Sequence, residues 1–261
     1  MLMRTKSSLV KALGMNISSG LENGEFSVFY QPQWDLFTKS VTGFEALARW
    51  HAPGYGQVPP SEFIPVAESN GGIRTLGEWV LLTACRQAKC WQVKEKKTFT
   101  ISVNVSGVQL EDINFSSRIM EILSMTGLKP QYLELEITES IFLGNLSSIL
   151  PSLEFLWQEG VRLALDDFGI GFSSIHHLSR LPLDCLKIDQ SFVRSLGYAQ
   201  TRIVIKAMAN LAKELGMRTV VEGVENKNEE FTLWQLGLSQ GQGYKLSPPV
   251  PAENAIRHLL D

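Results

Sequence analysis

Several short apolar segments of this sequence end on a carboxylate, a carboxamide or a lysine. Apolar runs of this length are typical of buried strands, and acidic groups gathered at the ends of such strands repel one another. The segments contribute Glu45, Asn104, Glu136, Asp166, Asp167, Lys187, Glu222 and Gln242. Because a cation must balance clustered acids, the pattern predicts oxygen ligands around divalent metal at one mouth of a barrel.

The types of these side chains narrow the choice of metal and of chemistry. Carboxylate and amide oxygens without supporting histidine or cysteine favour Mg²⁺ or Mn²⁺ over zinc. The adjacent Asp166 and Asp167 are well suited to bridging two ions. Two ions about 3.5–4 Å apart are the usual arrangement for phosphodiester hydrolysis. The residues alone therefore predict a two-metal site for phosphoryl chemistry, and they do not name the substrate.

Length and composition set limits on partners and location. The chain has 261 residues, enough for one α/β barrel, which needs about 250. Its net charge is −3, so we expect no nucleic-acid polymer as a partner. Three cysteines without metal-site spacing, Cys85, Cys90 and Cys185, indicate free thiols in a reducing compartment. Because no apolar stretch reaches membrane-spanning length, the sequence predicts a cytoplasmic protein whose own chain makes no membrane contact.

Helical patterns alternate with strand patterns from about residue 75 onward. Each helical pattern ends at a glycine, the usual left-handed stop, before a strand pattern begins. In the helix before residue 216, Val204, Met208, Leu211 and Leu215 fall on one helical face. The glycines are Gly127, Gly160, Gly216 and Gly237. Such units in series predict parallel strands with helical crossovers.

The beginning of the chain follows another pattern. Strand patterns at residues 26–35 and 41–50 are joined only by the short segment LFTKS, which allows a hairpin and excludes a helical crossover. The fold class is therefore α/β, a TIM-like (β/α)8 barrel with an antiparallel first strand. We expect an N-terminal helix or linker over residues 1–17 and one barrel domain over residues 18–261.

Alternation within the segment YLELEIT places its acids inside the barrel. Leu133, Leu135 and Ile137 are expected to face the helices, because successive side chains of a strand point to opposite sides. Glu134 and Glu136 then face the barrel interior. Glu136 lies nearer the carboxyl end of the strand, where barrel enzymes carry their active sites.

The segment Glu45-Ala46-Leu47-x-Arg49 is the signature of the EAL family of cyclic di-GMP phosphodiesterases. The chain resembles this family through PPSEFIPVAE, DDFGIGFSS, LKIDQSFV, VVEGVE and QGY as well, roughly over residues 18–255 and in the family's order. The resemblance implies hydrolysis of cyclic di-GMP to linear pGpG by a water that two metal ions activate. Such a reaction ends a bacterial second-messenger signal.

The resemblance also implies a role for each acidic position. One metal ion would be held by Glu45, Asn104, Glu136 and Asp166. The second would be held by Asp166 and Asp167, together with Glu222 directly or through water. Lys187 would sit beside the nucleophilic water and, with Glu45, Asp167 and Glu222, complete the catalytic set. The ions would be Mg²⁺ or Mn²⁺. Ca²⁺, with its larger and looser ligand shell, is expected to inhibit.

Other positions of the resemblance imply contacts with the nucleotide. These substrate-binding positions are Gln31, Leu47, Arg49 and Gln242, of which Arg49 would meet a phosphate oxygen. Glu139 resembles the residue that steadies the loop Asp167–Leu178, which couples metal binding to dimer contacts in the family. The resemblance therefore also implies a homodimer.

Two other functions stay open at this point. A catalytically silent receptor would bind cyclic di-GMP and relay its presence to a partner, although this chain has every metal-ligand position filled. Another barrel phosphodiesterase would use histidine as acid and base, and the chain has only four histidines. Single residues also have simpler interpretations: Lys187 as a salt-bridge partner, Arg49 as an ion pair at the mouth, and His176 and His177 as loop residues.

Overall fold

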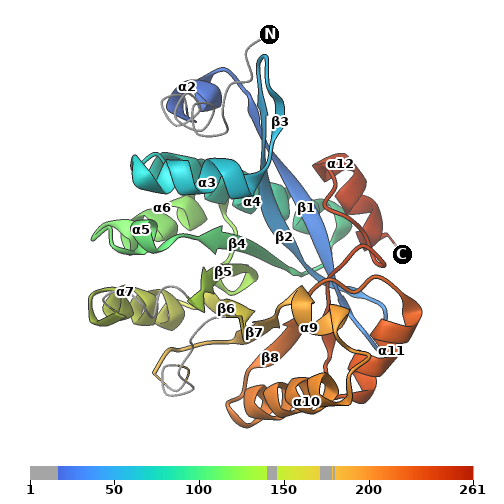
Figure 1. The fold of residues 1–261 in the computed structure, drawn as a ribbon. Helices are drawn as coiled ribbons and strands as arrows, with labels where there is room; N and C mark the ends of the chain where they lie inside the picture. Colours follow the sequence, from blue (N-terminus) through green and yellow to red (C-terminus); the bar gives the residue numbers. More distant parts are fainter. Residues whose placement is uncertain (1–16, 140–145, 171–177, 179, 261) are drawn as a thin grey trace, which may run out of the picture.

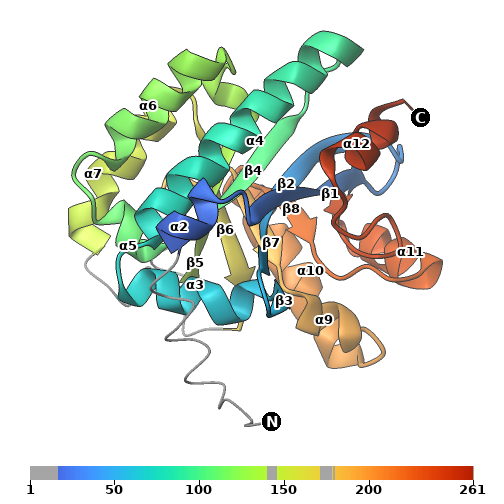
Figure 2. The same ribbon diagram turned by 90° about the horizontal axis from the view of Figure 1, so that it is seen from above.

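The chain folds around a closed barrel of strands in this computed structural model (Figure 1). The structure describes residues 17–139, 146–170, 178 and 180–260. Within them, nine strands form one sheet in the order β1-β9-β8-β7-β6-β5-β4-β2-β3, and β1 also pairs with β2. The sheet thus closes on itself, while β3 only extends β2 as a hairpin. Figure 2 shows the helices arranged around the strands, which confirms the predicted TIM-like α/β barrel.

The elements alternate along the chain as the glycine-terminated helical patterns predict. The strands are β1 (Phe26–Asp35), β2 (Val41–Ala52), β3 (Gly56–Val58), β4 (Thr100–Val105), β5 (Leu133–Thr138), β6 (Arg162–Phe168), β7 (Cys185–Ile188), β8 (Arg218–Val221) and β9 (Gln240–Gly241). The helices are α2 (Ile17–Glu22), α3 (Pro60–Ser69), α4 (Ile73–Glu95), α5 (Gly107–Leu110), α6 (Phe115–Thr126), α7 (Leu146–Gln158), α9 (Gln190–Arg194), α10 (Ala199–Glu214), α11 (Lys227–Gln235) and α12 (Ala252–Ala255). Two short 3-10 helices are η1 (Pro130–Tyr132) and η3 (Ile256–Leu259).

The first strand runs against its neighbours, as predicted. β1 pairs antiparallel with both β2 and β9, whereas each neighbouring pair from β2 through β4 to β9 is parallel. The Asp35 carboxylate accepts hydrogen bonds from the backbone N–H groups of Phe37 and Thr38, at 2.9 and 2.7 Å. This local bonding favours a tight turn. The hairpin register places Gln31 directly opposite Glu45.

The side chains of β5 divide between the two sides of the barrel wall. Leu133, Leu135 and Ile137 are fully buried in the apolar core between the strands and the outer helices. Glu134 and Glu136 are also buried, but their carboxylates meet polar groups inside the barrel. The prediction from alternation is therefore confirmed.

The apolar face predicted for α10 is only partly covered, because Met208 and Leu211 pack against the core and its other two members do not. In α10 the buried residues are Ile205, Ala209 and Ala212, whereas Val204 and Leu215 are 42% and 41% exposed. The apolar side chains of α10 are more numerous than its contact surface can cover. Small alanines occupy the line of closest approach because they let the helix lie near the strands.

A second polar network lies inside the barrel around Glu134. Glu134 accepts a hydrogen bond from Ser102 Oγ at 2.9 Å and forms an ion pair with Arg218. The Arg218 guanidinium also donates to Gln240 Oε1 at 2.7 Å. These bonds satisfy charges that would otherwise be costly to bury.

The ends of the chain and its membrane character complete the description. Residues 1–16, where we predicted a helix or linker, lie outside the described residues, and α2 begins at Ile17. The predicted boundary after residue 17 stays a prediction. Among the described residues, none of the helices combines the length and apolar character that a membrane crossing needs.

Candidate metal centre

Lys187 occupies the middle of the barrel mouth and contacts four carboxylates. Its side chain is only 1% exposed, and Nζ lies 2.7 Å from Glu136 Oε2 and 2.9 Å from Glu222 Oε1. Asp166 Oδ1 and Glu45 Oε2 are 3.1 and 3.6 Å away. We call these four acids the acidic cluster. They come from β2, β5, β6 and the residue after β8, so barrel closure brings them together.

The acidic cluster has more carboxylates than Lys187 alone can neutralise. Burial alone would lower the pKa of Lys187, but the surrounding carboxylates raise it well above its usual range, so this lysine stays charged. Burial raises the pKa of Glu136 well above normal, with the charge of Glu45 adding to the effect. Burial likewise raises the pKa of Glu222 to about 7, although Lys187 opposes it. A single ammonium does not neutralise four carboxylates.

Glu45 behaves differently from its neighbours in the cluster. Burial would raise its pKa, but Lys187 and the amide N–H groups of Gln242 and Asn104 together lower it. Asn104 Nδ2 donates to Glu45 Oε1 at 2.7 Å. This hydrogen bond leaves the side-chain oxygen of Asn104 available to a cation. Glu45 is thus held ionised at the rim of the cluster.

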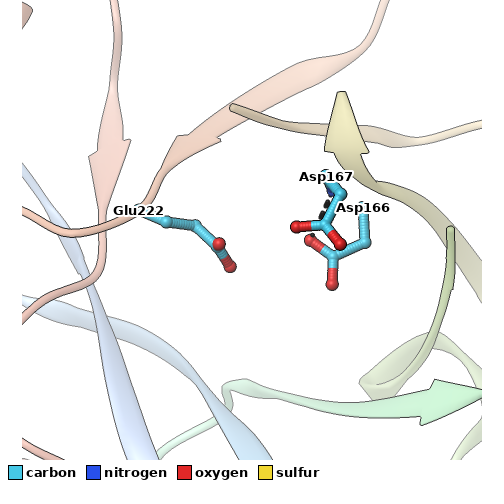
Figure 3. A group of neighbouring side chains, drawn as sticks. All are labelled: Asp166, Asp167 and Glu222. Carbon is cyan, nitrogen blue, oxygen red and sulfur yellow. Dashed lines mark hydrogen bonds between the residues drawn. The ribbon is translucent and has the colours of Figure 1, made fainter. Parts of the chain in front are cut away.

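Asp166, Asp167 and Glu222 form a second group of ligands beside Lys187. One carboxylate oxygen from each lies within 4.8 Å of the others, and Figure 3 shows the three side chains gathered around one space. Adjacent strand residues normally face opposite sides. Here the pairing of β6 with β7 shifts register between Leu165 and Phe168, and Asp167 has a left-handed φ of 57°. The irregular backbone brings both aspartates to the same group.

These residues fit a divalent cation. Every candidate ligand atom is an oxygen, the donor type that Mg²⁺ and Mn²⁺ prefer. Glu136 Oε1 is buried and has no hydrogen-bond partner among the described residues. A buried carboxylate oxygen without a partner is costly, and a bound cation removes that cost. The predicted ligands are therefore brought together, with Asn104 at their edge.

Three glutamines support Glu45 on the side opposite Asn104. Gln242 Nε2 donates both to Glu45 Oε2 and to Gln31 Oε1, the latter at 2.8 Å. Gln31 Nε2 donates to the backbone carbonyl of Ser247 at 3.1 Å. Gln33 Nε2 donates to Gln242 Oε1 at 3.2 Å. Sequence reasoning missed Gln33, although its position two residues after Gln31 on one strand indicates that both face inward.

Arg49 and Leu47 lie at the rim of the mouth. Arg49 Nη1 donates to the carbonyl of Ala48 at 2.9 Å, and its guanidinium lies 5.6 Å from the centre of the Phe29 ring. The predicted phosphate contact of Arg49 stays a prediction. Leu47 lines two cavities at once.

The two cavities that meet at Leu47 differ in character. A polar cavity of about 380 Å³ lies over the acidic cluster and includes Gln31, Gln242 and Tyr244 in its lining. An apolar cavity of about 460 Å³ lies between β2, α3 and α4, with Ile64 in its lining. A ligand with a charged part and a flat apolar part would match this pair of spaces.

Glu139 contacts the start of the loop that it was predicted to steady. Its Oε1 accepts a hydrogen bond from the backbone N–H of Gly169 at 2.9 Å. Gly169 has φ 100°, and a Cβ there would lie 2.7 Å from the Phe192 ring. Residues 171–177 of the loop, including His176 and His177, lie outside the described residues.

Comparison with known proteins agrees with the motifs and the fold. Residues 15–249 match the EAL domain family. The chain belongs to the EAL domain family. The cyclic di-GMP phosphodiesterase PA2567 of Pseudomonas aeruginosa is 37% identical over 235 residues, which are 90% of this chain and 40% of that protein. The oxygen sensor protein DosP of Escherichia coli is 36% identical over 242 residues, 92% of this chain and 30% of that protein. This EAL domain thus spans well under half the length of those relatives.

Solved structures of EAL proteins share the barrel. The PaMucR phosphodiesterase in complex with c-di-GMP has a TM-score of 0.88 and 35% identity, covering 94% of this chain and 99% of that one. The EAL enzyme Bd1971, with cAMP and cyclic di-GMP bound, has a TM-score of 0.92 and 31% identity, covering 98% of this chain and 70% of that one.

Proposed function

We propose that this EAL domain hydrolyses one 3′–5′ phosphodiester bond of cyclic di-GMP and releases linear pGpG. The observation that carries the proposal is the acidic cluster around the buried Lys187, beside the group formed by Asp166, Asp167 and Glu222. Phosphodiester hydrolysis needs concentrated positive charge near the phosphate. A site this rich in oxygen ligands is suited to collecting that charge.

The family resemblance and the grouping of the acids support one assignment of metal ligands. Divalent ions, when bound, supply positive charge that polarises the phosphate and lowers the pKa of water. We propose Mg²⁺ or Mn²⁺ as the natural ions, because the donors are hard oxygens. The first ion would be held by Glu45, Asn104, Glu136 and Asp166, and the second by Asp166, Asp167 and Glu222.

The chain's own residues supply a fixed charge and hold a carboxylate in one orientation. Lys187 keeps its proton in this site, so its ammonium offers a fixed positive charge to a phosphate oxygen or to the attacking water. Gln242 and Asn104 donate to the two oxygens of Glu45 and thereby fix the plane of that carboxylate. A fixed carboxylate loses less freedom when it binds a ligand.

The two cavities support the choice of a cyclic dinucleotide. Such a molecule has an anionic sugar–phosphate ring and two planar bases. The polar cavity would hold the ring at the carboxylates, and the apolar cavity would accept one base past Leu47. The names of the relatives PA2567 and PaMucR point to the same substrate.

Chromatography of the reaction products tests the proposal. Purified domain with cyclic di-GMP and Mg²⁺ or Mn²⁺ should yield pGpG, and Glu45→Ala should abolish the product. Failure to form pGpG with either metal, in protein that binds both metal and nucleotide, contradicts hydrolysis. That result would favour the silent receptor, which binds cyclic di-GMP equally in Ca²⁺ and in Mg²⁺.

Two further features of the family are also proposals for this chain. We infer that Ca²⁺ supports nucleotide binding but blocks hydrolysis, because its larger and more flexible coordination shell misplaces the water. Homodimerisation rests on the resemblance. Light scattering on the purified domain measures the oligomeric state directly.

A further inference from the structure

Gln33 lies inside the barrel, one layer beneath the acidic cluster. It follows Gln31 by two residues on β1, is 1% exposed, and pairs with Gly43 across β2. Its Nε2 donates to Gln242 Oε1 at 3.2 Å. Gln33 therefore touches no cluster carboxylate in the described structure but contacts the residue that supports Glu45.

The direction of each hydrogen bond in this chain of amides follows from one fixed acceptor. The backbone carbonyl of Ser247 only accepts, so the Gln31 amide presents its NH₂ there and its oxygen to Gln242. Gln242 must then use its NH₂ for Gln31 and for Glu45, whose carboxylate also only accepts. The oxygen of Gln242 is left facing Gln33, which supplies the matching N–H.

The barrel wall leaves room for the Gln33 amide. A Cβ at Gly43 would lie 2.4 Å from Thr100 Oγ1, closer than such contacts allow, and 3.2 Å from Gln33 Oε1, which is a tight contact. Gln33 Oε1 has no hydrogen-bond partner among the described residues. An apolar side chain would avoid the cost of burying that oxygen. The use of glutamine here therefore indicates a need for its N–H.

We propose that Gln33 is a positioning residue, whose amide holds Gln242 so that the Gln242 N–H stays aimed at Glu45. Glu45 then presents one fixed orientation to a divalent cation. Residues behind a metal ligand orient it and tune its affinity, and Gln33 extends this support one residue deeper. The proposal rests on the proposed function of the site as a metal centre.

The test measures Mn²⁺ affinity by titration calorimetry in the absence of nucleotide. Gln33→Met keeps the length of the side chain and removes the donor, and it should weaken Mn²⁺ binding about three- to tenfold. Gln33→Glu replaces the donor with an acceptor and favours a flipped Gln242 amide, so its loss should be larger. Excess Mn²⁺ should restore kcat of Gln33→Met to within about twofold of the parent protein, because only cation binding is impaired.

A matched control is Gln92→Met in α4. Gln92 Nε2 donates to the Phe99 carbonyl, also at 3.2 Å, outside the site. This variant loses the same kind of hydrogen bond and should bind Mn²⁺ as the parent protein does. A loss of Mn²⁺ affinity in Gln33→Met but not in Gln92→Met separates positioning from the general effect of losing such a bond.

A double-mutant cycle with Gln242→Met decides the route of the effect. If Gln33 acts through Gln242, adding Gln33→Met to Gln242→Met should cause no further loss of Mn²⁺ affinity. Additive losses, or an unchanged affinity in Gln33→Met, would overturn the proposal. If Gln33→Glu fails to fold, Gln33→Met and the cycle still decide.

The outcomes for the two proposals are distinguishable. Mn²⁺ binding that depends on Gln33, without any pGpG formation, would overturn hydrolysis alone. Hydrolysis with an Mn²⁺ affinity independent of Gln33 would overturn the positioning role alone. Absence of uptake of both Mn²⁺ and Mg²⁺ by the parent protein, with nucleotide as well as without it, would overturn both.

Discussion

The Lys187 ammonium lies 2.7 Å from Glu136 Oε2, and both side chains are almost completely buried. Without metal, the Lys187 ammonium is the positive charge nearest to the centre of the acidic cluster. Removing one partner of a buried pair leaves the other charge uncompensated. The stability of the metal-free protein therefore depends on Lys187, the residue that we also place beside the reacting phosphate.

Lys187→Met should destabilise the metal-free domain by about 3–5 kcal/mol, because several buried carboxylates lose their counter-ion. Urea unfolding in the presence of a chelator measures this free energy. Lys94→Met is the control, since Lys94 lies 4.0 Å from Glu95 with its side chain 67% exposed, and exposed pairs contribute under about 1 kcal/mol. Equal stabilities of the two variants would contradict the assigned role of Lys187.

Mn²⁺ affinity should rise with pH between about 6 and 8. Burial raises the pKa of Glu222 to about 7 and that of Glu136 well above normal. Below these pKa values the carboxyl groups hold protons that the metal must displace. For each proton displaced, the Mn²⁺ affinity falls about tenfold for every unit by which the pH is lowered. Calorimetry in buffers of different ionisation enthalpy counts the protons released. An affinity that does not change from pH 6 to pH 8 would show that these acids are not ligands.

Glu134→Ala should lower stability without changing Mn²⁺ affinity by more than about twofold. The substitution leaves Arg218 without its carboxylate and Ser102 Oγ without its acceptor, a loss of about 3–5 kcal/mol for a buried pair. Glu134→Gln keeps an acceptor for Ser102 and should lose less. Thermal unfolding and calorimetry on the same samples make the comparison. A tenfold loss of Mn²⁺ affinity would contradict this expectation, because it would mean that the network around Glu134 also orients the metal ligands.

Gly169→Ala should destabilise the domain more than Gly237→Ala. Both glycines have left-handed φ values, 100° and 95°, but a Cβ at Gly169 meets the Phe192 ring at 2.7 Å, whereas nothing lies within 4 Å at Gly237. Gly237→Ala thus reports the backbone cost alone, about 1–2 kcal/mol. Chemical unfolding gives both values. The excess at Gly169 should be accompanied by weaker Mn²⁺ binding, because Gly169 lies two residues after Asp167 and its N–H donates to Glu139.

Sequence patterns predicted the parts of this fold that depend on periodicity. The alternation in β5 placed Glu136 inside, and the short link between the first two strands predicted the antiparallel start. Periodicity was less informative for α10, because Val204 and Ile205 are similar residues and only the packing of Ala209 and Ala212 decides which side faces the barrel.

The candidate site was predicted as a set of residues but not as a set of contacts. Lys187 lies within a short strand pattern, and nothing in its neighbours along the chain shows that it meets four acids from distant segments. Gln33 was missed because its importance comes from Gln242, 209 positions away. Long-range hydrogen bonds of this kind depend on barrel closure and leave no local signal.

Asp167 lowers the stability of the fold but is a proposed metal ligand. Its φ of 57° suits glycine better than an acid, and burial together with Asp166 raises its pKa, so its negative charge is unfavourable in the metal-free protein. Asp167→Gly would relieve both costs while deleting a proposed ligand. If this domain were selected for thermal stability alone, glycine would therefore be favoured at residue 167. The selected variants would be stable barrels without the proposed activity.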